Sequence, residues 1–420
     1  MTIQILTTWL FFLSLFLTCH ASNSTEYVRR RKETSSLLYL ALGTSNTWGS
    51  GIGEENPTPF TYPALMGSTR VKNLGSRASG PGYPAVCLQT MVGDSPYRVI
   101  IIEYMLRADE GLGQLAHRVR HRFPQAVLIF LDVWYPRMVS VIGSGIRPDN
   151  DRIGLKAYQN HLGFKGLNDP DFINHLQTNP HKMIINHRFD LQAIQRKIAR
   201  SVSGYVWHMP MPTKEDQVGA HVAQLAPLFS DDFKHLSKRG HAYVARGLKR
   251  LLRSMPPNNL PTMTMPMMNP WSCEDSCASW FLNGKVPHEY GSRIKLIMFD
   301  EEAGNYALEV DSSGGSLILK NPFLEPATLY FSYMATGEPR QYPKTRVTVG
   351  TNSTIVDPVY GGPDHTAVTT KIGILQPGSN AVQIQPLETF DLPFRLVATS
   401  ITQFDLMLDL GLVNIQAIAQ

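Results

Sequence analysis

Three polar residues that lie far apart in the chain have the side chains that acyl transfer requires. Ser45 lies in a glycine-flanked turn, GTSNTWG at 43–49, directly after an apolar run. Asp232 and His235 form an Asp-x-x-His segment, in which one local turn lets the carboxylate orient the imidazole. A serine nucleophile, a histidine base and an aspartate that orients the base make a hydrolytic triad. We therefore predict that Ser45, His235 and Asp232 are the catalytic residues.

A glycine-bearing segment, NLGSRASG at 73–80, predicts a loop that can turn backbone N–H groups inward. When a serine attacks a carbonyl, the oxygen that becomes negative needs donors that are in place before the reaction. The backbone N–H of Ser45 is one natural donor. The sequence thus predicts an oxyanion site that draws on the Ser45 turn and on this loop.

The order and spacing of these motifs resemble those of the SGNH/GDSL hydrolase family over roughly residues 35–255. That family has its nucleophile in a Gly-Asp-Ser motif near the N-terminus and an Asp-x-x-His motif near the end of the domain. The segment KRGHA at 238–242 also resembles the closing block of the family. The resemblance implies a three-layer α/β/α sandwich with a parallel sheet, ester hydrolysis by Ser45, Asp232 and His235, and no metal or organic cofactor.

The same resemblance assigns the remaining oxyanion donors. Gly80 is the second candidate donor, because its place late in the 73–80 loop resembles the second block of the family; Gly75 is the alternative. The third block of the family normally supplies an Asn side chain, and Ala108 stands near that position here. The adjacent Arg107 is the candidate replacement, with a surface arginine as the other interpretation. Thr44 stands where the family usually has Asp.

A second tripeptide, Gly-Asp-Ser at 93–95, matches the family motif better than Gly-Thr-Ser at 43–45 does. It precedes an apolar run instead of following one, so Ser95 would face the wrong end of the sheet. Reacting groups in α/β enzymes lie beyond the carboxyl ends of the strands. We therefore predict Ser45 over Ser95 as the nucleophile.

The elements around these motifs alternate between strands and helices. Continuous apolar runs predict buried strands at 37–42, 98–104, 126–131 and 204–207. Helices are expected at 113–123, 191–202 and after Ser237, which is a suitable N-cap residue. Strands that alternate with helices predict a parallel α/β sheet, and we place this domain at residues 37–254.

The second half of the chain has a different pattern. A Met/Pro-rich segment at 255–270 predicts a linker. From residue 271 to 420, short β-prone runs are separated by Gly, Pro, Asn and Asp, and helical periodicity is nearly absent. We predict an all-β sandwich domain here, which either binds glycan or binds the hydrolase domain.

The N-terminal segment indicates where in or outside the cell the protein is located. A short apolar run that ends in Cys19-His20-Ala21 predicts a secretory signal peptide at 1–21, followed by a linker at 22–36. An uncleaved membrane anchor formed by residues 8–21 is the alternative. On either interpretation the protein is secreted or at the cell surface. The sequons at Asn23 and Asn352 are then candidate glycosylation sites.

Export also bears on the cysteines, because cleavage would leave Cys87, Cys273 and Cys277 in an oxidising compartment. The closeness of Cys273 and Cys277 predicts a local disulfide between them, since a zinc site would need further ligands nearby. His117 and His121 have a spacing that metals can use. Their arginine neighbours favour a solvated basic face instead, and we predict no metal site.

Composition limits the classes of function that remain. Of the 420 residues, 43% are hydrophobic and 10% aromatic, which excludes wholesale disorder and a collagen-like fibre. The net charge of +5 is too small and too scattered for a nucleic-acid binder. The sequence favours a secreted serine esterase that acts on acyl esters, with O-acylated carbohydrate as the expected substrate. A catalytically inactive glycan-binding protein and an acyltransferase with the same triad stay open.

Overall fold

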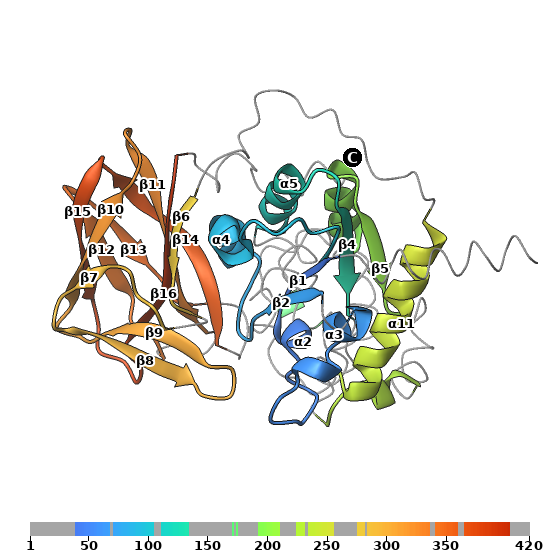
Figure 1. Ribbon diagram of the computed structural model, residues 1–420. Helices are drawn as coiled ribbons and strands as arrows, with labels where there is room; N and C mark the ends of the chain where they lie inside the picture. Colours follow the sequence, from blue (N-terminus) through green and yellow to red (C-terminus); the bar gives the residue numbers. More distant parts are fainter. Residues whose placement is uncertain are drawn as a thin grey trace, which may run out of the picture.

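The chain forms two domains that pack side by side, one α/β and one all-β (Figure 1). The computed structural model describes residues 38–67, 70–104, 111–133, 170–171, 174, 192–210, 224–231, 234–255, 275–281, 284–336, 341–359 and 365–403. Several predicted features lie outside these residues: the signal peptide or anchor, Asn23, Arg107, Asp232, and the linker beyond Met255. Within the described residues, no helix combines the length and apolar character needed to span a bilayer.

Within the residues that the structure describes, the first domain contains a parallel sheet of five strands in the order β2-β1-β3-β4-β5. Its strands are β1 (Tyr39–Gly43), β2 (Val71–Gly75), β3 (Val99–Glu103), β4 (Val127–Asp132) and β5 (Tyr205–His208). β2 lies on one side of β1, and β3, β4 and β5 follow in chain order on the other side. The direction of the strand order therefore reverses between β1 and β3, which is the topological switch point of the sheet. Ligands of open α/β sheets bind beyond the carboxyl ends of the strands at such a point.

Helices cover both faces of this sheet because successive strand residues point to opposite sides. Leu40, Leu42 and their equivalents in β3 and β4 pack against α4 (Gly82–Val92), α5 (Leu112–Arg122) and the helical residues 192–201. On the other face, Tyr39, Ile101 and Leu131 pack against α3 (Tyr62–Gly67) and α11 (Lys238–Ser254). Further helical elements of the described residues include α2 (Ser45–Trp48), η1 (Thr58–Phe60) and η5 (Ala226–Leu228). The three-layer α/β/α arrangement is therefore confirmed.

The second domain is a sandwich of two antiparallel sheets, as the sequence predicts. One sheet has the order β13-β12-β15-β10-β7, and the other has the order β14-β11-β16-β9-β8, with β6 also paired to β16. The strands are β6 (Asp275–Ser279), β7 (Glu289–Tyr290), β8 (Ile294–Asp300), β9 (Asn305–Val310), β10 (Gly315–Asn321), β11 (Ala327–Ala335), β12 (Thr345–Val349), β13 (Asn352–Val356), β14 (Thr366–Leu375), β15 (Gly378–Pro386) and β16 (Phe394–Thr402). Aliphatic and aromatic side chains from both sheets form a core between them.

Helix α4 lies between the two domains and is buried on both sides (Figure 1). Ala85 and Leu88 belong to the core of the α/β domain. Tyr83, Val86 and Cys87 instead join a cluster with residues of the β domain, listed as Phe281, Ala307, Tyr330, Met334, Tyr342, Ala367, Val397 and Ala398. A helix that is apolar on all sides is normally buried on all sides, and here the second domain provides that burial.

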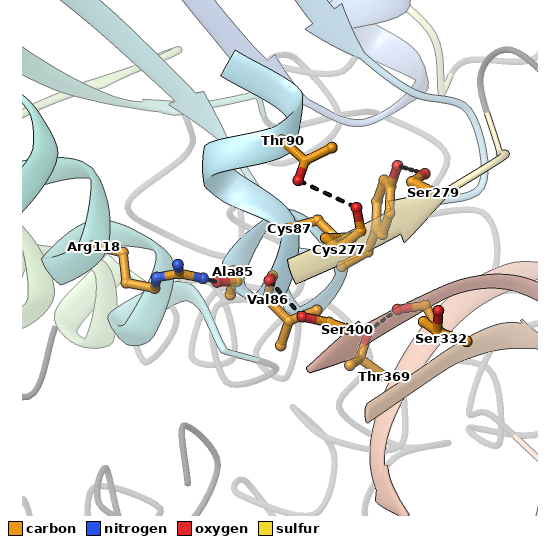
Figure 2. Close-up of a disulfide and its surroundings, with 12 residues drawn as sticks. Ala85, Val86, Cys87, Thr90, Arg118, Cys277, Ser279, Ser332, Thr369 and Ser400 are labelled. Carbon is orange, nitrogen blue, oxygen red and sulfur yellow. Dashed lines mark hydrogen bonds between the residues drawn. A yellow bond between two sulfur atoms is a disulfide. The ribbon is translucent and has the colours of Figure 1, made fainter. Parts of the chain in front are cut away.

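A disulfide joins Cys87 of α4 to Cys277 of β6, with the two Cα atoms 5.2 Å apart (Figure 2). The predicted pairing of Cys273 with Cys277 is therefore wrong, because a sulfur forms only one such bond. Pairing with β16 fixes β6 against the sheet and places Cys277 beside α4, although its partner is 190 residues away. Cys277 does not pair with Cys273, its neighbour in sequence, because the docking of β6 on α4 places Cys277 beside Cys87.

Further polar contacts hold α4 to the β domain around this disulfide (Figure 2). The Ser400 hydroxyl donates to the carbonyl of Val86 over 2.8 Å, and the Thr90 hydroxyl donates to the carbonyl of Cys277 over 3.2 Å. The hydroxyls of Tyr83 and Ser279 are also hydrogen-bonded. Apolar burial, hydrogen bonds and a covalent link therefore act on the same interface.

Two local expectations differ from the structure. Residues 73–75, expected in a loop, form the end of β2, so the loop itself comprises residues 76–80. In the helix expected to carry a solvated basic face, Arg118 and Arg120 are buried. Arg120 donates to the carbonyls of Val202 and Ala126, each over 2.8 Å. Backbone carbonyls outside the helix thus replace the water that a surface arginine would have.

Candidate active site

Ser45 is placed by the tight junction between β1 and α2. β1 ends at Gly43, Thr44 is the N-cap residue of α2, and Ser45 occupies the first helical position. The Thr44 hydroxyl accepts a hydrogen bond from the backbone N–H of Asn46 over 3.4 Å. A Cβ at Gly43 would lie 2.0 Å from Thr47 Oγ1, so only glycine fits at this turn. The serine therefore lies at the carboxyl edge of β1, beside the switch point of the sheet.

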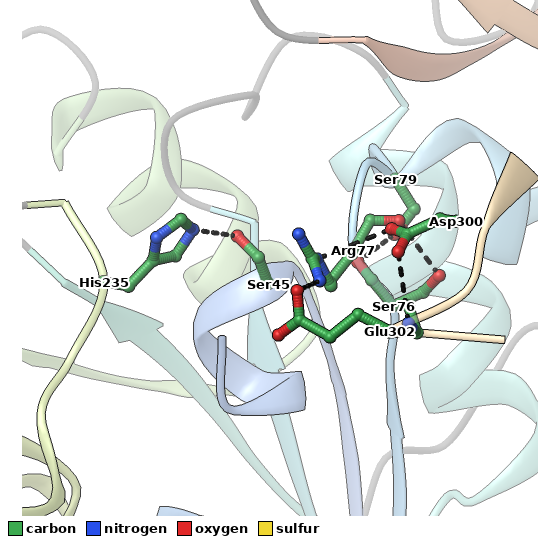
Figure 3. A network of polar contacts seen from close by, with 8 residues as sticks. Ser45, Ser76, Arg77, Ser79, His235, Asp300 and Glu302 are labelled. Atoms are coloured by element: carbon green, nitrogen blue, oxygen red, sulfur yellow. Dashed lines mark hydrogen bonds and ion pairs between the residues drawn. The ribbon is translucent and has the colours of Figure 1, made fainter. Parts of the chain in front are cut away.

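His235 meets Ser45 at this edge, although 190 residues separate them in sequence (Figure 3). His235 Nε2 lies 2.8 Å from Ser45 Oγ, which is hydrogen-bonding distance. The histidine lies in the segment between η5 and α11, and Ser237 caps α11 by accepting a hydrogen bond from the N–H of Gly240. The structure thus brings together two of the three residues predicted for the triad.

Asn46 fixes the histidine segment against α2. Its side-chain oxygen accepts the backbone N–H of Leu236 over 2.8 Å, and its side-chain nitrogen donates to the carbonyl of Lys234 over 3.5 Å. Asn46 is only 4% exposed, so these contacts are largely shielded from water. Gly51 allows the close approach, because a Cβ there would lie 2.7 Å from Cβ of His235. Asn46 and Gly51 therefore set the position of His235.

A buried carboxyl group lies beneath the serine turn at the end of β3. Glu103 accepts hydrogen bonds from the Thr44 N–H over 3.0 Å, from the Thr44 hydroxyl over 2.8 Å and from the Thr47 hydroxyl over 3.0 Å. Burial raises the pKa of Glu103 to about 7, and the same hydrogen bonds act in the lowering direction. Aspartate at position 44 would place a second carboxylate against Glu103, whereas the threonine hydroxyl donates to it. This contact gives a physical reason for Thr44 in this chain.

A second histidine near the site is neutral. His241 is fully buried in α11, and its Nδ1 accepts the backbone N–H of Tyr62 over 3.0 Å. Burial, with a smaller contribution from the charge of His235, lowers the pKa of His241 to about 3. An uncharged imidazole that accepts a backbone hydrogen bond has a structural role, because it positions α3 against α11.

The loop 76–80 forms the other side of the Ser45 site and contacts the β domain (Figure 3). The guanidinium of Arg77 lies 5.4 Å from the ring centre of Trp48 in α2. It also pairs with Glu302 and lies 3.6 Å from the carboxylate of Asp300, at the β8–β9 turn. Charged groups of both domains therefore meet beside the serine.

The sequence-predicted residues fall into three groups in the structure. Ser45 and His235 are in contact, and Gly80 is buried at the end of the 76–80 loop. Asp232 and Arg107 lie outside the described residues. Ser95 is exposed before the amino end of β3, at the opposite edge of the sheet from Ser45.

The sequence did not mark three residues of this site as functional. Glu103 carried a weak signal, since it is a charge at the end of an apolar run; nothing in the sequence marked Asn46 or Arg77. Asn352, the described sequon, is exposed at the start of β13.

The architecture is a parallel α/β sandwich joined to a β sandwich, with a serine and a histidine in contact at the carboxyl edge of the parallel sheet. No protein-family model matches the sequence, and no curated protein matches it. Among solved structures, the chain is similar to a two-domain esterase (CEX) active on acetylated mannans and co-crystallised with mannopentaose. The two share 13% identity at a TM-score of 0.53, over 91% of this chain and 95% of that chain.

A second structure of that two-domain esterase gives 12% identity, a TM-score of 0.53, and coverage of 90% of this chain and 95% of the other. At this level of identity the likeness concerns the fold. Because the coverage is nearly complete in both chains, it extends to both domains.

Proposed function

We propose that this protein is a serine esterase that hydrolyses acyl esters of carbohydrates. The observation that carries the proposal is the 2.8 Å contact between Ser45 Oγ and His235 Nε2 at the switch point of the sheet. A hydroxyl in contact with an imidazole is the arrangement that activates serine as a nucleophile.

The reaction follows from that contact. Ser45 Oγ attacks the ester carbonyl carbon while His235 Nε2 takes the hydroxyl proton. The tetrahedral intermediate collapses, the imidazolium gives its proton to the leaving alcohol, and the acyl group stays on Ser45. Water then loses a proton to His235 and attacks the acyl carbon to form a second tetrahedral intermediate. As this intermediate collapses, the bond to Ser45 Oγ breaks, the imidazolium returns its proton to Ser45 Oγ, and the carboxylic acid leaves. We assign Asp232, three residues before His235, to orient and stabilise the imidazolium; the mechanism requires no metal or organic cofactor.

The oxyanion donors in this proposal come from both sides of Ser45. The Ser45 N–H is at the first position of α2, where a backbone N–H has no acceptor within the helix. Gly80, at the end of the loop 76–80, is the second donor. Arg107 is the third, in place of the amide that Ala108 lacks.

The substrate class is supported by the likeness to an esterase active on acetylated mannans, because that likeness includes the β domain. Polar groups of the β domain also reach the site, since Asp300 and Glu302 lie against Arg77. We therefore propose an O-acylated polysaccharide as the ester, with acetyl as the first acyl group to test.

The test is acetate release from acetylated mannan by wild-type protein, with Ser45→Ala as the inactive variant. Ser95→Ala is the matched control, because Ser95 carries the Gly-Asp-Ser motif at the wrong edge of the sheet. Activity that survives Ser95→Ala and disappears in Ser45→Ala supports the esterase. Binding of the polymer without acetate release would favour an inactive glycan-binding protein. Acetate transfer to added oligosaccharide in place of release would favour an acyltransferase.

The proposal includes export through the signal peptide at 1–21, with the chain secreted or held at the cell surface. The Cys87–Cys277 disulfide supports it, because such bonds persist mainly in oxidising compartments. N-terminal sequencing of the protein from its native source should begin at residue 22. An intact N-terminus in a membrane fraction would instead identify residues 8–21 as an anchor.

A further inference from the structure

We infer that the β domain sets the geometry of the oxyanion loop, and that the backbone N–H of Ala367 is the positioning group. This inference rests on the proposed function of Ser45 and concerns a contact made by a different domain. Ala78, in the loop 76–80, has φ +53°, in the left-handed region that alanine rarely occupies.

The loop has a fixed start and a fixed end, so its conformation depends on the residues between them. At its start, the N–H of Ser76 donates to the carbonyl of Gly43 over 2.9 Å, directly beside the Ser45 turn. At its end, Pro81 leads into α4, which is buried. The conformation of Ala78 therefore decides where the N–H groups between these anchors point.

The β domain contacts Ala78 in this conformation through a backbone hydrogen bond. The N–H of Ala367 in β14 donates to the carbonyl of Ala78 over 2.6 Å, and Ser79 forms a parallel bridge with Ala367. Among the described residues, β14 is the edge strand of its sheet and pairs there only with β11, so this N–H bonds outside its own sheet. Strain of this kind persists only where surrounding structure holds it, and it is concentrated at functional sites.

A second contact acts on the neighbouring residue. The pairing of Arg77 with Glu302 and Asp300 draws the side chain toward the β8–β9 turn. Because Arg77 directly precedes Ala78, a second contact with the β domain lies beside the strained residue. The Cys87–Cys277 disulfide and the apolar cluster around Tyr83 hold α4, which follows the loop, against the β domain.

The experiment removes the hydrogen bond without altering the Ser45 side chain or its partners. Ala367→Pro eliminates the N–H, and an edge strand tolerates proline where the N–H faces away from the ladder. We expect kcat/KM to fall about 10-fold, the population factor that corresponds to the cost of left-handed alanine. Ala367→Gly keeps the N–H and is the matched control, which should retain far more activity than Ala367→Pro.

A rescue variant separates this role from general damage. Glycine adopts positive φ without cost, so adding Ala78→Gly to Ala367→Pro should recover most of the lost kcat/KM. Ala78→Val, which leaves the β domain unchanged, should lower kcat/KM by itself because a β-branched residue opposes this conformation. No rescue by glycine, or full activity in Ala78→Val, would overturn the inference.

Backbone amide exchange tests the same inference without activity. In Ala367→Pro the amides of residues 76–80 should exchange faster, while those in α4 keep their protection. Unchanged exchange in the loop would overturn the inference even if activity fell. An inactive wild-type protein that showed the expected exchange would contradict only the proposed esterase function.

Discussion

The two sides of Ser45 are built in different ways. On one side, His235 is held by Asn46 and Gly51, which belong to the same domain and to the turn that carries the serine. On the other side, Ala78 is held by Ala367 in the second domain. If the proposed mechanism holds, the geometry of proton transfer is set within the α/β domain, whereas the proposed oxyanion side depends on how the two domains dock.

The largest effect should come from the proton-transfer side. We expect Ser45→Ala or His235→Ala to lower kcat by on the order of 10⁴–10⁶, because these residues act as a unit. For the same reason the double variant should be scarcely worse than either single one. Circular dichroism and thermal unfolding should show an intact fold, since both residues are only partly buried at the ends of elements. Losses that multiply in the double variant would contradict a shared mechanism.

The next largest effect concerns domain docking. Cys277→Ser should lower the free energy of unfolding by about 2–5 kcal/mol, because the disulfide restricts a long unfolded loop. Cys273→Ser is the matched control and should leave the Cys87–Cys277 bond intact. Denaturant unfolding gives the stability, and peptide mapping without reductant gives the pairing. Loss of the disulfide in Cys273→Ser but not in Cys277→Ser would contradict the interface described above.

A smaller effect depends on pH and arises beneath the serine. The pKa of Glu103 is about 7 in the folded chain, against an ordinary value of 4.5, so the folded state holds this proton more tightly. This contribution to stability is complete below pH 4.5 and is lost as the pH rises through 7. The difference of about 2.5 pKa units corresponds to roughly 3 kcal/mol.

Glu103→Gln tests this effect because it removes the titration and retains an oxygen that can accept the threonine hydrogen bonds. Relative to the wild type, the free energy of unfolding of the variant should therefore rise between pH 4.5 and pH 8. Chemical denaturation at several pH values measures it. Parallel curves for the two proteins would show that Glu103 titrates normally in the folded state.

The smallest expected effect concerns Asn46, which holds the segment that carries His235. Asn46→Ala leaves the buried N–H of Leu236 without its acceptor, which should cost about 1–3 kcal/mol of stability. Because His235 then loses its support, kcat should fall more than KM rises. Asn46→Asp retains an acceptor oxygen and is the control. Equal kinetics for Asn46→Ala and the wild type would show that the histidine segment is held by other contacts.

The sequence predicted what depends on local pattern. The apolar runs at 37–42 and 98–104 became β1 and β3, and the turn between 43 and 49 placed Ser45 at the carboxyl edge of the sheet. Ser237 was predicted as a helix cap, and it caps α11. In each case hydrophobic periodicity or a capping side chain determines the element, so a short window of residues is sufficient.

The features that the sequence could not predict depend on contacts between distant segments. Cys277 pairs with Cys87 because β6 docks on α4, and Arg120 is buried because carbonyls of other elements accept its N–H groups. The conformation of Ala78 likewise depends on β14, 289 positions further along at Ala367. In each of these pairs the two residues lie far apart in sequence, and no motif or periodicity connects them. A single sequence therefore carries no signal for the pairing.

The central claim is that Ser45 is a nucleophile activated by His235, and a fluorophosphonate probe tests it most directly. Such a probe bonds covalently to an activated serine, so mass spectrometry of the peptides locates the adduct. We predict one adduct, on Ser45, that is absent from Ser45→Ala and strongly reduced in His235→Ala. An adduct on Ser95, or no adduct on folded wild-type protein, would contradict the account.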